Sequence, residues 1–261
     1  MDTLLFTTPA WIICLLIMII MLVCIKAGSL IGKKKINHED YVENAANNTI
    51  FGSVVGLFAF LLAFSFSMSG SRFDARRTAT ITEANAIGTA ILRADLYPQA
   101  EREAFRKDFK AYLEVRINYL TAVRKENKMD DVHKEQDKIS QDLWQRAMRL
   151  SVNAPSVVPA NLMTPALNDM FDSATANDYS ELMRVPESIV IMLFLLSFVS
   201  AFFVGYISAE KGKLDRYVAF GFCFLSALVI FITLDLDRPR RGLIKLNTSH
   251  EAITSLREQF K

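Results

Sequence analysis

The sequence has few of the residues that build disulfide frameworks and metal centres, with three cysteines and three histidines in 261 residues. The cysteines all lie inside apolar segments, where a free cysteine behaves as a small buried hydrophobe: Cys14, Cys24 and Cys223. The histidines are far apart and have no cysteine or carboxylate companions at metal-ligand spacing: His38, His133 and His250. We therefore expect neither a disulfide scaffold nor a metal site.

The motifs of common enzyme classes are also missing. The sequence contains no HExxH, no GxSxG and no phosphate-cradling GxxxxGK[ST]. Glu83 is the one carboxylate that attracts attention, on an otherwise neutral stretch after an arginine-rich turn, and such a residue is more often a structural ion-pair partner. We expect no enzyme and no cofactor.

Concentrated charge of one sign is scarce as well, because the formal net charge is only +2. The two basic runs, residues 33–35 and 238–241, each adjoin an apolar segment, as residues that hold helix ends at lipid headgroups do. Nucleic-acid binding needs a concentrated basic face, so the charge pattern excludes it.

Long uncharged apolar segments are present instead, at residues 4–25, 49–71, 188–209 and 217–234. Crossing a bilayer core takes about 20 apolar residues in a helix. The sequence therefore predicts an all-α integral membrane protein with four transmembrane helices, in contact with membrane lipid. The first segment has an acidic start and no basic region before it, so we interpret it as a retained anchor rather than a secretory signal.

The order of the segments predicts two transmembrane hairpins, a 2+2 arrangement, with one extramembrane domain between helices 2 and 3. The intervening residues read as helical, because Phe105, Phe109 and Tyr112 recur three or four residues apart. The predicted domains are 1–71, a transmembrane hairpin; 72–187, the helical domain; 188–234, a second hairpin; and 235–261, a C-terminal segment packing on the extramembrane domain.

The second apolar segment carries small residues on one narrow face of its helix: Gly52, Gly56, Ala59, Ala63, Ser67 and Gly70. Two interpretations stay open. Such a stripe is the usual surface for close helix association in lipid, and it also leaves room for a water-filled path along an oligomer axis. In the second case four aromatic residues are candidate constrictions: Phe58, Phe60, Phe64 and Phe66.

No strong helix stop lies between Gly52 and Tyr97, so we expect this helix to continue beyond the membrane. There a neutral polar strip follows the small-residue stripe, with Ser71, Thr78, Thr82, Asn85 and Thr89 in a sector of roughly 60°. A solvated face is more often charged. Neutral hydroxyl and amide groups indicate either a wet lumen or a hydrogen-bonded helix contact, and the sequence leaves both open.

Charged residues follow the second and fourth apolar segments on the same predicted side of the membrane. We expect Arg72, Arg76 and Arg77 at the level of Asp235 and Asp237, where they form ion pairs or lie at a charged mouth. Charges that only snorkel at the interface are the alternative.

Three motifs resemble the bestrophin-like domain family of four-helix membrane proteins, named for a likeness to bestrophin anion channels. They are "EANAIGTAILRAD" at 83–95, "ALNDMFD" at 166–172 and "LDLDRPRRGLIKL" at 234–246. The resemblance implies a homo-oligomer, a pentamer as in bestrophins, with the second helix around the axis. The second helix lacks aromatic triplets similar to a bestrophin neck, and the C-terminal tail lacks an acidic cluster similar to its calcium clasp.

We therefore expect an oligomeric, anion-conducting ion channel of the bacterial inner (plasma) membrane. The predicted path is lined by Gly52, Gly56, Ala59, Ala63 and Ser67 and extended by Thr82, Asn85 and Thr89. The alternative is a non-conducting scaffold or sensor whose helical domain binds a partner protein.

Overall fold

The computed structural model describes residues 8–36, 45–122, 129–153, 158–210, 215–238, 242–244 and 247–261. Over these residues the secondary structure is helical and contains no strand, which confirms the predicted all-α class. The chain divides into two compact units. A membrane unit comprises residues 1–72 and 184–238, and a second unit comprises residues 73–183 and 239–261.

The membrane unit contains α2 (Ala10–Ile36), the first part of α3 (Ala45–Arg93), α7 (Glu187–Glu210) and α8 (Arg216–Leu236). Within the described part of the chain, four helices are long and apolar enough to cross a membrane. This confirms the prediction of four such helices. The expected start of the first one, near Leu4, lies outside the described residues.

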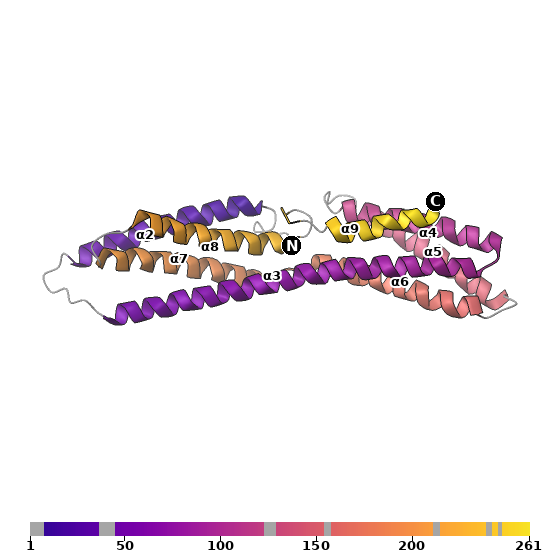
Figure 1. Ribbon diagram of the computed structural model, residues 1–261, viewed down its shortest axis with the longest axis horizontal. Helices are drawn as coiled ribbons and strands as arrows, with labels where there is room; N and C mark the ends of the chain where they lie inside the picture. Colours follow the sequence, from indigo (N-terminus) through magenta and orange to yellow (C-terminus); the bar gives the residue numbers. More distant parts are fainter. Residues whose placement is uncertain are drawn as a thin grey trace. The chain divides into compact units, whose positions relative to one another are not determined.

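Figure 1 shows α2 lying along α7 and α8, and α2 packs most extensively on α7. Glycine allows this close approach. A Cβ added to Gly205 would lie 1.9 Å from the backbone oxygen of Ile25, and one added to Gly28 would lie 2.1 Å from that of Phe202. Gly32, four residues after Gly28, is similarly crowded by Ala209 and Tyr206. The tight GxxxG contact of this chain therefore belongs to α2.

The GxxxG pair predicted from the sequence, Gly52 and Gly56, has a different environment. A Cβ added to either glycine would meet nothing within 4 Å. In the described part of a single chain, these two glycines are therefore not used for close helix association.

α3 is an uninterrupted helix of 49 residues, as the absence of a stop between Gly52 and Tyr97 predicted, and Figure 1 shows it as one continuous ribbon. It passes into a short 3-10 turn, η1 (Ala94–Leu96), and ends before Tyr97 and Pro98. A residue that precedes proline is biased away from helical dihedral angles, and Tyr97 is extended, with φ −96° and ψ 157°.

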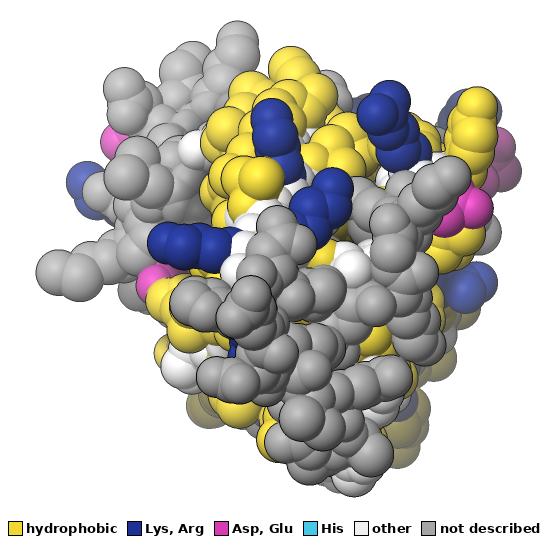
Figure 2. All heavy atoms as spheres, turned by 90° about the vertical axis from the view of Figure 1, so that its left-hand side faces the viewer, with side chains coloured by type: hydrophobic (Ala, Val, Ile, Leu, Met, Phe, Trp, Pro, Cys, Tyr) yellow, Lys and Arg dark blue, Asp and Glu magenta, His cyan; other side chains and the backbone are white. Residues whose placement is uncertain are grey.

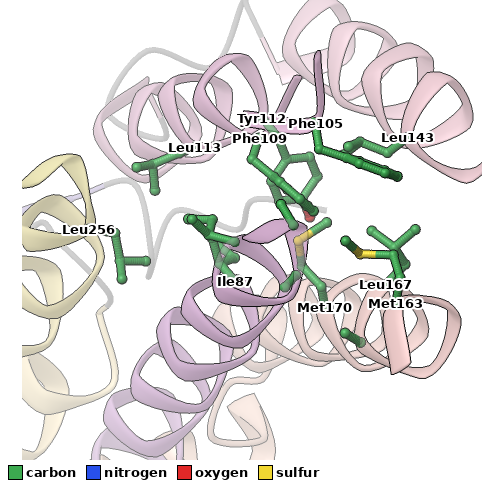
Figure 3. Close-up of a cluster of buried hydrophobic side chains, with 14 of the residues drawn as sticks. Ile87, Phe105, Phe109, Tyr112, Leu113, Leu143, Met163, Leu167, Met170 and Leu256 are labelled. Atoms are coloured by element: carbon green, nitrogen blue, oxygen red, sulfur yellow. The ribbon is translucent and has the colours of Figure 1, made fainter. Parts of the chain in front are cut away.

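The second unit adds α4 (Gln99–Ala122), α5 (Met129–Asn153), α6 (Val158–Leu182), α9 (Asn247–Thr254) and η3 (Ser255–Phe260). Its core joins the end of α3 to these helices (Figure 3). Ile87, Phe105, Phe109, Tyr112 and Leu143 are all completely buried. The three- and four-residue spacing of Phe105, Phe109 and Tyr112 therefore does mark the inner face of α4.

The C-terminal segment packs on this core through Leu256, which lies beside Ile87 in Figure 3. The approach to α3 is close, because a Cβ on Gly88 would lie 3.3 Å from Cδ2 of Leu256. Arg257 donates to both carboxylate oxygens of Glu114 on α4, at 2.8 and 2.6 Å. This arginine holds the pKa of the Glu114 carboxyl below its usual range.

The α2–α7 contact generates a stability prediction. Gly205→Ala should destabilise the membrane unit, because the new methyl group would overlap the backbone of Ile25; overpacking of this kind costs about 1–3 kcal/mol. Gly221→Ala, on α8, is the matched control, since a Cβ there meets nothing within 4 Å. Thermal unfolding in detergent should show a lower midpoint for the first variant and little change for the second. Equal midpoints would contradict the close approach.

Candidate functional site

The membrane half of α3 presents its small-residue stripe to the outside of the chain. Gly52, Gly56, Ala59, Ala63 and Ser67 are all exposed. The face is therefore free to meet other copies of the chain or to line a path between them.

The four candidate constrictions divide into two groups. Phe60, Phe64 and Phe66 are 68%, 50% and 42% exposed, and they flank the stripe. Phe58 is only 3% exposed and packs edge-on against Phe222 of α8, with ring centroids 6.4 Å apart. Phe58 therefore anchors α3 to the rest of the membrane unit, and we leave it out of the path proposed below.

The neutral polar strip is likewise exposed, at Ser71, Thr78, Thr82, Asn85 and Thr89. In the second unit its last three members line a cleft of about 530 Å³ between α3 and α6. The side chains of Thr82, Asn85 and Thr89 make no hydrogen bond to any other described residue. Among the described residues of a single chain, then, Thr82, Asn85 and Thr89 border an open cleft and form no hydrogen-bonded contact with another helix.

The other wall of the cleft comes from α6, for which the sequence pattern predicted no role. The lining residues there are small or acidic: Ala166, Asp169, Asp172, Ser173 and Ala176. The sequence did indicate that these residues lie together. Positions 166, 169, 173 and 176 are three or four residues apart, so they share one face of the helix. Periodicity alone could not show that this face is opposite Thr82, Asn85 and Thr89.

A buried polar network lies behind the strip and joins four helices. Arg116 of α4 forms an ion pair with Glu83 of α3, and both side chains are completely buried. Arg116 also donates to Asp178 of α6 at 2.9 Å and to Gln136 of α5 at 2.9 Å. Glu83 accepts a further hydrogen bond from the amide of Asn177 at 2.6 Å. This confirms Glu83 as a structural ion-pair partner.

The charge state of Arg116 follows from these neighbours. Burial alone would lower the pKa of the Arg116 guanidinium, but the Glu83 and Asp178 carboxylates more than offset it, and the net direction is upward. The guanidinium also lies over the Tyr119 ring, 4.7 Å from its centroid. Arg116 therefore stays cationic and holds Glu83 in the interior.

The predicted charged mouth is only partly exposed. Arg77 is exposed and Arg72 is half-buried. Arg76, Asp235 and Asp237 are 1%, 3% and 2% exposed. The backbone N–H of Val185, just before α7, donates to both carboxylate oxygens of Asp237, at 3.0 Å each. Asp237 thus ties the end of α8 to the start of α7, and its ion pair with an arginine of α3 stays a prediction.

Metal ligands do not gather in the described part of the chain, where no group of three or more His, Cys, Asp or Glu side chains is placed to hold an ion. His133 instead packs its ring against Tyr119, with centroids 5.1 Å apart. Cys14 and Cys223 are buried, and Cys24 is partly buried, in the membrane unit.

The buried ion pair generates a second prediction. Arg116→Met should lower the free energy of unfolding by about 3–5 kcal/mol, because it leaves the Glu83 carboxylate buried without its cation. The double variant Glu83→Met with Arg116→Met should recover part of that loss, since the stranded charge is gone. Arg257→Met, which breaks an exposed pair, is the control and should change stability little. Chemical denaturation measures all three, and equal losses for the two single variants would refute a special role for the network.

Comparisons with known proteins agree with this architecture. A family model described as Bestrophin-like domain matches residues 14–250. A search of curated proteins found no match.

Solved structures share the fold. A variant of a bacterial bestrophin homologue from Klebsiella pneumoniae has a TM-score of 0.72 at 13% identity, covering 97% of this chain and 99% of the other. A second variant of that homologue gives 0.70 at 14% identity, covering 95% and 99%. A variant of a membrane protein gives 0.67 at 16% identity, covering 96% and 97%. Because the family model covers most of the sequence, this chain belongs to the Bestrophin-like domain family.

Proposed function

We propose that the protein is a homo-oligomeric ion channel of the bacterial inner membrane, with α3 of each copy around a central path. Five copies, as the family resemblance implies, would place the small-residue stripe at the axis within the membrane. Thr82, Asn85 and Thr89 would continue the path beyond it. No catalytic step is part of this proposal.

One observation carries the proposal: the eight predicted lining residues on α3, which are Gly52, Gly56, Ala59, Ala63, Ser67, Thr82, Asn85 and Thr89, are all exposed in the single chain. A stripe that only joined helices within the chain would be covered, as Gly28 and Gly205 are. Neutral side chains on such a face also suit a lumen, because hydroxyl and amide groups hydrogen-bond to water without binding an ion tightly.

The charges near the path bear on selectivity. Exposed Arg77 and half-buried Arg72 would favour anions by their field. Asp169 and Asp172, on the α6 wall of the cleft, act in the opposite direction. We propose an anion-conducting channel in which the arginines dominate and the aspartates moderate the preference.

The second candidate function is a non-conducting scaffold or sensor. It is favoured by the cleft itself, which is large enough to receive a side chain or short segment of a partner. Native mass spectrometry of the protein released from detergent micelles separates the two. A path built from one helix per subunit needs several copies, so a monomer or a dimer as the largest species would rule out the channel.

The polar strip generates a third prediction. Asn85→Leu with Thr89→Val should reduce single-channel conductance several-fold, because an apolar lining favours dewetting of the path. Thr175→Val is the matched control, since Thr175 is an exposed threonine of α6 outside the cleft. Planar-bilayer recordings of purified protein measure both. Unchanged conductance in a correctly assembled double variant would show that the strip does not line the path.

The opposed charges generate a fourth prediction. Arg72→Gln with Arg77→Gln should shift the reversal potential in a salt gradient towards the cation value. Asp169→Asn with Asp172→Asn should shift it the other way, because a repulsive field for anions is removed. Both shifts should shrink at high ionic strength, where the Debye length is about 3 Å at 1 M. Shifts of the same sign, or none, would place the selectivity determinant elsewhere.

A further inference from the structure

The end of the membrane unit where α2 finishes carries a concentration of positive charge. Four lysines of α2 are exposed there: Lys26, Lys33, Lys34 and Lys35. α2 contains no aspartate or glutamate between Ala10 and Ile36. Figure 2 faces this end and shows dark-blue basic side chains among yellow apolar ones, with fewer magenta acidic ones towards the edges. The exposed lysines of α2 therefore stand beside exposed apolar side chains at this end, where Asp215 is also exposed.

Lys26 is the unusual member of the group, because it lies inside the apolar part of the helix. Seven residues separate it from Lys33, which corresponds to about 10 Å along a helix axis. Trp11, 62% exposed, stands 22 residues before Lys33 and so about 33 Å away along the axis. That spacing matches the hydrocarbon thickness of about 30 Å. Lys33 is thus at headgroup level, and Lys26 must extend its ammonium group upward from deeper in the bilayer.

The lysines differ in whether their ammonium groups contact another residue of the same chain. Lys35 donates to the Tyr206 hydroxyl at 2.9 Å and lies 5.6 Å from the centre of its ring. Lys26, Lys33 and Lys34 form no hydrogen bond or ion pair with any residue that the structure describes. A charge held inside a bilayer is costly without a counter-charge. The described part of the chain thus supplies no counter-charge to these three lysines, and an anionic group beside them would be stabilised, most of all at Lys26.

The same face of α2 is also shaped for hydrocarbon. Positions 23, 26, 30, 33 and 34 fall within a sector of about 100° on the helix. Val23 and Leu30 are each 61% exposed. The lysines and the apolar residues consequently share one side of α2. Along the helix, Lys26 lies between Val23 and Leu30, and Lys33 and Lys34 follow Leu30.

We propose that this face of α2 binds one anionic phospholipid. Its phosphate would lie between the ammonium groups of Lys26 and those of Lys33 and Lys34, and one acyl chain would run along Leu30 and Val23. A free phosphate ion would match the charge but would leave the exposed apolar residues unused, which is why a lipid is the better fit. Arg216 and Tyr217, both exposed at the start of α8, add interfacial side chains at this end of the unit.

Native mass spectrometry of the full-length protein, released from nanodiscs of equal parts phosphatidylglycerol and phosphatidylcholine, tests the proposal. The natural sequence should retain phosphatidylglycerol preferentially. Each neutralised lysine should weaken that preference about fivefold, the change that corresponds to about 1 kcal/mol per basic residue near an anionic surface. Lys26→Gln with Lys33→Gln should therefore weaken it about 25-fold, and Lys26→Arg should leave it nearly unchanged.

Two controls make the test specific. Lys107→Gln with Lys110→Gln removes two exposed lysines from α4 in the second unit and should not alter lipid retention. Inorganic phosphate at millimolar concentration should not displace the lipid. Equal retention of the two lipids by the natural sequence, an equal loss in the α4 control, or displacement by phosphate would each overturn the proposal. Because lipid retention is read without any current, it is separable from the channel proposal.

Discussion

The packing of the helices within the second unit depends on the guanidinium of Arg116. It lies at the junction of α3, α4, α5 and α6 and is held by Glu83, Gln136 and Asp178. A buried charge persists only where hydrogen bonds and a counter-charge satisfy it. Those partners come from different helices, so the ion pair fixes how α3 is rotated about its own axis.

That rotation decides which residues of α3 face outward. Successive helical residues are about 100° apart, so Asn85 points about 200° away from Glu83. Thr82 and Thr89 fall on the same outer side. Because Glu83 is held in the interior, the neutral strip faces the cleft. The position of one buried carboxylate therefore determines both which residues of α3 enter the core and which residues line the candidate path.

The helices of the membrane unit are held together in a different way, because lipid supplies no hydrophobic force between helices. Glycine lets α2 and α7 approach until a single added carbon would overlap backbone. α3 joins this unit through larger side chains such as Phe58 and keeps its own small residues on the outside. The result is a tight helix pair beside a helix whose small-residue face remains available to other copies.

Local sequence was sufficient for features that depend on one helix at a time. Uncharged runs predicted the four membrane helices, because the bilayer imposes a minimum apolar length. The absence of a stop predicted the continuity of α3, and Tyr97-Pro98 marked its end. The isolation of Glu83 on a neutral stretch indicated an ion pair.

Only the tertiary structure could decide how those helices face one another. The partners of Glu83 lie 33 and 94 residues away, at Arg116 and Asn177, and no periodicity links positions on separate helices. The sequence carries two GxxxG pairs, and nothing local shows that α7 covers Gly28 and Gly32 while Gly52 and Gly56 stay open. The same holds for Phe58, one of six phenylalanines on α3, and for Asp169 and Asp172. Composition and spacing fix which residues share a helix face, but what covers that face is a property of the other helices.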